Sequence, residues 1–257
     1  MEEYTLYLNY FNKTTDELIE HLDCAKKQSH KPKIVVACFL GTKNPELFTT
    51  YLEYVKKHKL KNWYYTVSNY NYKYIGRYQL AINSPTDYIV MLDDDRYPYE
   101  NYCKRMVQTA KKYDAIVQQY GWILKKNKKG EWEDMSGSMA HPLLLNKKSF
   151  VKALLDTKSN VMEVDYLCGG MVFHKKHLCN IFNEPLITDK TGEDIIFCLK
   201  SKAKGVKVLA YFPQILEQDG SDWLAHKGGI VSSTLKSPDS PKIKKIRSLL
   251  IQKYKND

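Results

Sequence analysis

Three consecutive aspartates, Asp93, Asp94 and Asp95, directly follow the apolar run YIVML at residues 88–92. A continuous apolar run of this length is typical of a strand buried on both faces, so the carboxylates are expected at the mouth of such a strand. Side chains alternate along a strand, so Asp93 and Asp95 point the same way and could converge on one hard cation. Adjacent carboxylates repel one another, and a metal ion removes that conflict. The sequence therefore predicts a divalent metal site, with a solvated acidic loop or a helix N-cap as the alternative.

A second acidic pair, Glu193 and Asp194, follows Gly192 at the start of a predicted helix. The unpaired amide groups and the dipole at a helix start stabilise ionised carboxylates. An ionised carboxylate is what a general base needs to take a proton from an attacking hydroxyl group. Two interpretations of this pair therefore stay open, a catalytic base and a helix cap, and they do not exclude each other.

Strand and helix patterns alternate along the chain. Apolar runs predict strands over residues 34–39, 63–67, 88–92, 115–120, 165–173 and 206–212. Capping and breaking residues predict helices that begin near residue 15 and at Pro45, and others over 76–82, 99–113, 148–155 and 192–205. This alternation predicts a doubly wound α/β sheet, in which ligands bind beyond the carboxyl ends of the strands.

The run YIVMLDDD resembles the strand and D-x-D motif of GT-A fold glycosyltransferases, especially those of glycosyltransferase family two. Three further segments are similar to that family and occur in its order. They are the helix that contains Gly76 and Arg77, the acceptor-side strand CGGMVF at 168–173, and the E-D element at Glu193 and Asp194. The resemblance covers about residues 33–212. It implies a GT-A (Rossmann-like) mixed sheet flanked by helices in a single domain.

The resemblance also implies a function, that of a hexosyltransferase-like enzyme. Such an enzyme moves a sugar from a nucleotide-diphosphate sugar, with a UDP-sugar favoured, to a hydroxyl group of a glycan or another acceptor. An inverting reaction is expected, with Asp194 as general base and Glu193 as its helper, while retention stays open. Mn²⁺ or Mg²⁺ would be held by Asp93 and Asp95, with His226 in a late loop as a further ligand. The predicted donor-binding residues are Phe39, Gly41, Thr42, Arg77, Asp93, Asp94 and Lys227.

Three segments are expected along the chain. Residues 1–32 are predicted to form an N-terminal helical extension. Residues 33–236 form the glycosyltransferase domain, with a nucleotide-sugar half over about 33–120 and an acceptor half over about 121–236. Residues 237–257 form a basic C-terminal helix. Because this helix combines apolar and basic residues, it either packs on the domain or lies on an anionic membrane.

The bulk composition limits the partners and the compartment. The chain of 257 residues carries a formal net charge of +11, which favours anionic partners. Six scattered cysteines without a C-x-x-C pair predict reduced thiols, and no apolar run approaches the ~20 residues of a membrane span. We therefore expect a soluble cytoplasmic protein, in the host cytoplasm if it is viral, with at most peripheral contact with a membrane.

Two other classes of function fit part of the sequence. Clustered carboxylates with a histidine also suit a metal-dependent nuclease or phosphotransferase. The charge excess alone would suit a non-catalytic nucleic-acid-binding protein, but no recognised binding motif supports this, and no nucleic-acid partner is expected. Neither G-x-x-x-x-G-K-[ST] nor G-x-G-x-x-G occurs in the sequence, which argues against P-loop and dinucleotide-cofactor enzymes. The ordered set of segments favours glycosyl transfer.

Overall fold

The computed structural model describes residues 1–42, 44–72, 75–119, 121–139, 160–183, 191–211, 224–226 and 240–256. The first half of the chain forms β1 (Tyr4–Asn9), α1 (Thr15–Lys27), β2 (Ile34–Leu40), α2 (Glu46–Lys57), β3 (Trp63–Ser68), α3 (Ile75–Ile82), β4 (Tyr88–Leu92), β5 (Arg96–Pro98), α4 (Tyr102–Tyr113) and β6 (Ala115–Gln118). The second half forms β7 (Gly121–Lys126), β8 (Trp132–Met139), β9 (Val161–Glu163), β10 (Tyr166–Leu167), β11 (Gly170–His174), the 3₁₀ turn η1 (Lys175–Leu178), α6 (Cys179–Phe182), α7 (Glu193–Ala203), β12 (Lys207–Tyr211), β13 (Leu224–His226) and α9 (Ser240–Asn256).

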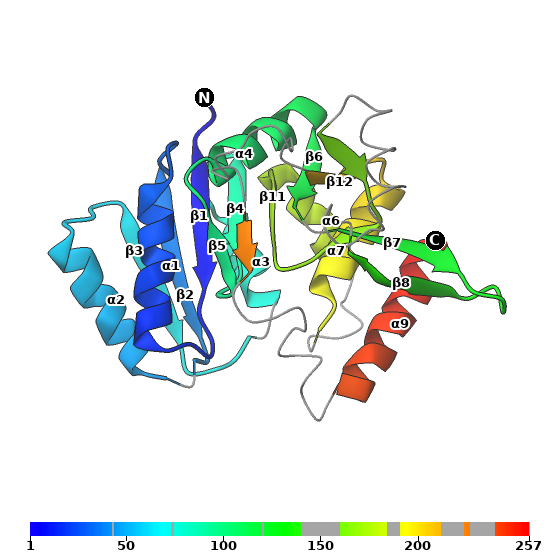
Figure 1. The fold of residues 1–257 in the computed structure, drawn as a ribbon, viewed down its shortest axis with the longest axis horizontal. Helices are drawn as coiled ribbons and strands as arrows, with labels where there is room; N and C mark the ends of the chain where they lie inside the picture. Colours follow the sequence, from blue (N-terminus) through cyan, green and yellow to red (C-terminus); the bar gives the residue numbers. More distant parts are fainter. Residues whose placement is uncertain are drawn as a thin grey trace.

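One mixed sheet of eight strands, in the order β3-β2-β1-β4-β11-β6-β12-β9, forms the centre of the molecule (Figure 1). β1 pairs in parallel with β2 and β4, β2 with β3, and β6 with β12. β11 runs antiparallel between β4 and β6. A three-stranded sheet, β10-β7-β8, and a two-stranded sheet, β13-β5, complete the described strands. The parallel strands end at one common edge of the main sheet, and the segment that follows β4 lies there.

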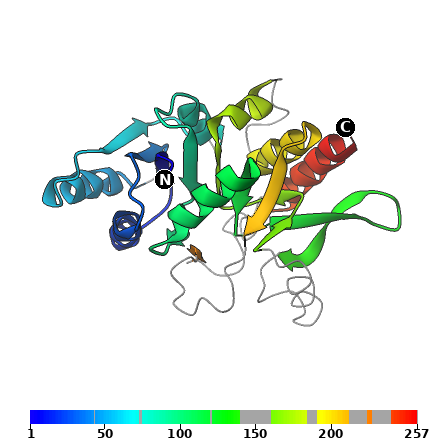
Figure 2. The same ribbon diagram turned by 90° about the horizontal axis from the view of Figure 1, so that it is seen from above.

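Helices cover both faces of the main sheet because its strands carry apolar side chains on both sides (Figure 2). α1, α2 and α4 share one hydrophobic core with the sheet. α3, α6, α7 and α9 share a second core on the other face. Successive residues of β4 alternate between the cores, with Val90 in the first and Met91 in the second, as the two-residue period of a strand requires. The predicted α/β sheet flanked by helices is confirmed.

Most of the predicted elements are also confirmed. The predicted strands correspond to β2, β3, β4, β6 and β12, and the predicted helices to α1, α2, α3, α4 and α7. The strand predicted over 165–173 is instead two strands, β10 and β11. Gly169 between them and Gly170 at the start of β11 have φ values of +80° and +121°, which redirect the chain. The helix predicted over 148–155 lies outside the described residues.

The N-terminal segment contributes a central strand that the sequence patterns did not predict. The expected helix in residues 1–32 is present as α1, and its start is closed by a capping box between Thr14 and Glu17. β1 precedes this helix and lies between β2 and β4. Its residues Leu6 and Leu8 are completely buried. The main sheet therefore includes a strand from residues 1–32 in addition to the predicted helix.

The basic C-terminal helix, α9, packs on the body of the protein. Leu250, Ile251 and Tyr254 are buried and belong to the same core as α7. The side chain of Gln252 bonds the backbone of Trp132 at the start of β8, accepting from its N–H at 3.0 Å and donating to its carbonyl O. Of the two alternatives for this segment, the structure shows the packed helix.

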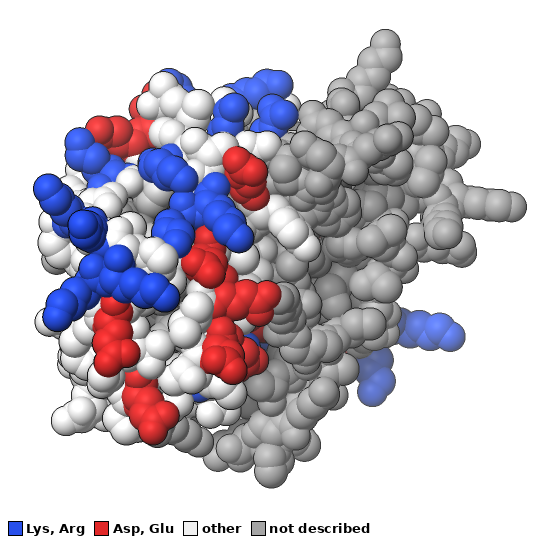
Figure 3. Space-filling model, turned by 60° about the vertical axis from the view of Figure 1, so that its left-hand side comes forward, with Lys and Arg blue, Asp and Glu red and all other residues white. Residues whose placement is uncertain are grey.

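Charged side chains are unevenly distributed on the side of the molecule formed by α1, α2 and β3. Figure 3 shows lysine and arginine side chains gathered over the upper part of this face, with most aspartate and glutamate side chains below them. α1 has the same polarity along its axis, with Asp16 and Glu17 in its first turn and Lys26 and Lys27 in its last. In the part of the chain that the structure describes, no helix is both long enough and apolar enough to cross a bilayer.

A buried histidine, His21 on α1, lies below the segment that follows the aspartates. Its ring is completely buried against the rings of Tyr10 and Tyr97, and Nε2 lies 2.8 Å from the carbonyl O of Arg96. Because a carbonyl oxygen can only accept, the neutral ring carries its proton on Nε2 and donates it. Burial disfavours the charged ring and lowers the pKa of His21 to about 4.

We therefore expect the free energy of unfolding to fall as the pH is lowered from about 6.5 to about 4. Over this range His21 binds a proton in the unfolded chain but not in the folded one. The stability that the neutral, buried His21 contributes is therefore complete above about pH 6.5. As the pH falls to about 4, about 3 kcal/mol of this stability is lost. Urea denaturation from pH 7 to pH 4 should show a shallower loss for His21→Gln. His58→Gln, at a half-exposed position after α2, is the matched control and should keep the slope of the unchanged protein. Equal slopes in all three proteins would contradict this assignment.

Candidate active site

The three aspartates emerge from β4 at the edge where the parallel strands end. All five residues of β4 are buried, and β4 lies between β1 and β11. Gly170 of β11 pairs with Leu92, the last residue of β4. On the other side, Asn9 at the end of β1 donates from Nδ2 to the carbonyl O of Leu92 at 3.1 Å. The point at which the aspartates leave the sheet is therefore fixed by both neighbouring strands.

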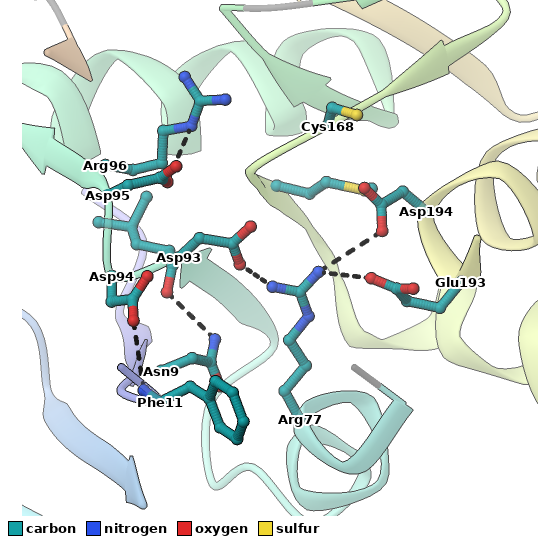
Figure 4. Close-up of polar contacts among 12 residues, drawn as sticks. Asn9, Phe11, Arg77, Asp93, Asp94, Asp95, Arg96, Cys168, Glu193 and Asp194 are labelled. Carbon is teal, nitrogen blue, oxygen red and sulfur yellow. Dashed lines mark hydrogen bonds and ion pairs between the residues drawn. The ribbon is translucent and has the colours of Figure 1, made fainter. Parts of the chain in front are cut away.

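Asp93 and Asp95 each face an arginine (Figure 4) and are partly exposed to solvent. Asp93 forms an ion pair through Oδ1 with Arg77, and the Oδ1 of Asp95 lies 3.5 Å from the Nε of Arg96. The side chains of Asp93 and Asp95 are 27% and 29% exposed. A ligand from solution can therefore reach both carboxylates.

Asp94 is directed at the segment that follows β1. Its Oδ2 accepts a hydrogen bond from the backbone N–H of Phe11 at 3.2 Å. Burial raises the pKa of Asp94, against the opposing effects of the Lys13 charge and the Phe11 N–H. Asp94 therefore holds the loop after β1 against the end of β4.

One guanidinium, that of Arg77 on α3, joins the two acidic groups that the sequence separates. Arg77 is only 3% exposed. Its NH1 contacts Asp93, while its NH2 lies 2.9 Å from the Oε1 of Glu193 and 3.5 Å from the Oδ1 of Asp194. Figure 4 shows this side chain between the end of β4 and the start of α7. Because three carboxylates share one guanidinium, an excess of negative charge remains, which a proton or a second cation would relieve.

Glu193 and Asp194 have opposite pKa shifts. Burial raises the pKa of Glu193 well above its usual value, and the adjacent Asp194 raises it further. Burial also opposes the ionisation of Asp194. The hydrogen bond with Glu193 and the charges of Arg77 and Arg247 outweigh this effect and lower its pKa. We therefore assign a proton to Glu193 and the negative charge to Asp194.

The start of α7 is held by the C-terminal helix. Gly192 precedes α7 with a φ of +86°, and a Cβ at this position would come within 2.4 Å of the Cδ1 of Leu250 on α9. Any other residue would therefore be strained at this positive φ, and the end of the Leu250 side chain would have to move. One turn away on α9, Arg247 lies with its NH2 3.6 Å from the Sγ of Cys168. α9 thus supports the corner that carries Glu193 and Asp194.

The predicted donor-binding loop after β2 is fixed to its neighbours mainly through its backbone. The ring of Phe39 is completely buried in the core, so this side chain does not face the site. Gly41 has a φ of +73° and donates its N–H to the carbonyl O of Ser68 at 2.7 Å. Thr42 donates from Oγ1 to the carbonyl O of Phe11 at 3.0 Å. The loop therefore links the ends of β1, β2 and β3.

The backbone of His226 lies next to the aspartates. β13 pairs with β5 so that His226 is opposite Arg96, the residue after Asp95. Lys227 lies outside the described residues. Within the part of the chain that the structure describes, no group of three or more His, Cys, Asp or Glu side chains could hold a metal ion.

Two arginines at the site were missed by the sequence analysis. Arg96 directly follows the aspartates, and its guanidinium fills the space where a side chain at Gly169 would lie, with Nε 2.2 Å from the position of a Cβ. The signal for Arg247 was its spacing from Leu250 and Tyr254, which places it on the apolar face of the last helix. A basic residue on such a face indicates a buried partner.

Comparison with known proteins supports the fold. No protein-family model and no curated protein matches the sequence. Among solved structures, the crystal structure of GalNAc-T7 with UDP, GalNAc and Mn²⁺ matches with a TM-score of 0.61 at 13% sequence identity. The match covers 81% of this chain and 42% of that chain, so this chain spans less than half of that protein's length. The protein therefore has a GT-A-like glycosyltransferase fold. The match gives no preference to family two.

We expect Arg77→Met to lower the free energy of unfolding at pH 7 by about 3–5 kcal/mol, because it leaves buried carboxylates without their cation. The loss should be smaller at pH 5, because the charge of Arg77 is one of the causes that lower the pKa of Asp194, and without it this carboxyl group takes up a proton more readily. Urea denaturation at both pH values measures the difference. Arg105→Met, at a half-exposed position on α4, is the matched control for loss of an arginine. A loss at pH 7 no larger than that of the control would contradict the central role of Arg77.

Proposed function

We propose that this protein is a metal-dependent glycosyltransferase that moves a sugar from a nucleotide-diphosphate sugar, with a UDP-sugar favoured, to a hydroxyl acceptor. The observation that carries the proposal is the contact of Arg77 with Asp93 after β4 and with Glu193 and Asp194 at the start of α7, on a GT-A-like fold. The structural neighbour was solved with UDP and Mn²⁺, which is consistent with this donor and this class of cofactor.

The donor would bind at the edge formed by the ends of β1, β2 and β4, with the first half of the chain as the nucleotide-sugar half. Asp93 and Asp95 offer exposed carboxylate oxygens, which suit Mg²⁺ or Mn²⁺. A bound ion would offset the charge that develops on the leaving diphosphate. Arg77 would keep a fixed positive charge between the donor and Asp194. His226 would be a further ligand of this ion, because its strand, β13, pairs with β5 next to Asp95.

The acceptor would approach from the second half of the chain, across the start of α7. Asp194, as the ionised member of its pair, would take the proton of the acceptor hydroxyl group. The acceptor oxygen would then form its bond to the anomeric carbon while the bond from that carbon to the diphosphate breaks, which inverts the configuration. Glu193 would keep its own proton and hold Asp194 in place.

We expect UDP to bind only in the presence of Mn²⁺ or Mg²⁺, because the aspartates alone repel the diphosphate. Calorimetry should show that Asp93→Asn and Asp95→Asn each weaken metal-dependent UDP binding by at least about tenfold. The matched control is Asp87→Asn, an exposed aspartate before β4 at the opposite end of the strand, which should bind as the unchanged protein does. Equal UDP affinity with excess EDTA would refute the metal dependence.

We also expect Asp194→Asn to reduce the transfer rate by at least about 10²-fold with nearly unchanged donor affinity, the effect of removing a general base. Glu193→Gln replaces a carboxyl group that we assign as protonated with a neutral amide, so it should reduce the transfer rate much less. Initial rates with a UDP-sugar and its best acceptor measure both variants. If the rate survives in Asp194→Asn but not in Glu193→Gln, the two roles are exchanged. If it survives in both, a retaining mechanism replaces the inverting one.

A further inference from the structure

The end of the main sheet opposite the candidate active site carries a continuous group of lysines. The parallel strands begin at this end, and α1 and α2 end there. Six exposed lysines come from four separate segments, the ends of α1 and α2 and the loops before β2 and β3. We call them the lysine end: Lys27, Lys31, Lys56, Lys57, Lys59 and Lys61. Figure 3 shows the gathering of basic side chains on this part of the surface.

Direct contacts hold the four segments together. Lys26 Nζ lies 3.4 Å from the Nδ1 of His58, which joins the end of α1 to the end of α2. Asn62 Nδ2 donates to the carbonyl oxygens of Pro32 and Lys33, each at 3.1 Å, which joins the loops before β3 and β2. The lysine end is therefore one surface with fixed spacing.

Lysines outnumber carboxylates on this surface, which also carries the exposed Glu53 on α2 and Glu100 beside the backbone of Ser29. Asp23 and Glu3, two carboxylates at the same end, already pair with Lys26 at 3.3 Å and Lys33 at 2.8 Å. Across the described residues, no member of the lysine end is in an ion pair with a carboxylate. Because repulsion among six exposed lysines opposes folding, an external anion would stabilise this surface.

The excess of exposed lysines over carboxylates continues along the same end of the sheet beyond β1 and β4. The carboxylates of Glu2, Asp87 and Asp114 are paired there with Lys111, Lys175 and Lys176. Lys112, Lys204 and Lys207 are exposed in addition. The charge therefore spreads across the whole end of the molecule rather than along one groove.

The way the charge is spread favours a lipid surface over nucleic acid. The lysines cover a broad end of the molecule, and of the four arginines in the chain three, Arg77, Arg96 and Arg247, lie at the candidate active site. Lysine is a hydrated point charge that suits diffuse attraction to a plane of anionic headgroups. Recognition of nucleic acid usually adds the bidentate contacts of arginine within a groove or stripe.

We propose that the lysine end docks this protein on an anionic membrane surface. The carboxylate-bearing edge of the sheet then faces away from the bilayer into the aqueous phase. This inference does not depend on the proposed enzymatic activity, because it uses none of the residues at the candidate active site.

Sedimentation of the full chain with lipid vesicles tests the proposal. The chain should bind vesicles with about 30% phosphatidylserine but not pure phosphatidylcholine vesicles, and less at about 0.5 M than at about 0.1 M salt. The combined change Lys31→Gln, Lys56→Gln, Lys57→Gln and Lys61→Gln should weaken binding at least about a hundredfold, since each lysine near such a surface contributes roughly fivefold. Thermal unfolding of both proteins verifies that the variant is folded.

The matched control removes the same charge elsewhere, with Lys125→Gln, Lys128→Gln and Lys129→Gln on the β7–β8 hairpin and Lys253→Gln on α9, all exposed. This control should bind vesicles within a few fold of the unchanged chain. Failure to bind anionic vesicles, or equal losses in the two variants, would overturn the proposal. So would tighter binding to a nucleic-acid duplex at the same salt that only the lysine-end variant loses, which would assign the surface to nucleic acid.

Discussion

The candidate site depends on one buried guanidinium. Arg77 reaches from α3 between the aspartate that ends β4 and the acidic pair that starts α7. A charge buried to this extent must keep its partners, so the ends of three elements from both halves of the chain are fixed relative to one another. The proton that we assign to Glu193 and the charge of Arg247 near Asp194 relieve the repulsion among the acidic groups that share this cation. The fold therefore creates a rigid corner in which one carboxyl group is neutral and its neighbour is ionised.

Close backbone packing makes this corner possible. Gly170 lies so near β4 that a Cβ would come within 2.5 Å of the carbonyl O of Met91, and Gly192 is contacted by the end of the Leu250 side chain on α9. These two glycines let β11 and α9 approach the chain on either side of Arg77. The last helix, which is basic and amphipathic, thereby becomes part of the support of the site.

Local patterns predicted the parts of the site that lie on continuous sequence signals. The apolar run before Asp93 and the helix start at Glu193 are such signals, and both were located correctly. β1 was missed although Thr5 and the tyrosine and leucine residues around it favour a strand. In the fold, Thr5 is buried and its hydroxyl group is satisfied by Ser84 and Thr86. The orientation of Asp94 and the contact of Arg247 with Cys168 depend on distant segments, which no local pattern contains. The interior position of the Phe39 ring likewise follows from its core neighbours across the sheet.

The place of β11 has a consequence for how the chain reaches this structure. β11 inserts antiparallel between β4 and β6, and both of these strands precede it in the chain. Its pairing closes long loops, as do the pairings of β1 with β4 and of β6 with β12, so it is among the slow events of folding. Until it inserts, the apolar edge of β4 is open to pairing with another chain. The strand that completes the corner around Arg77 is thus also the one whose delay would expose the nascent protein to aggregation.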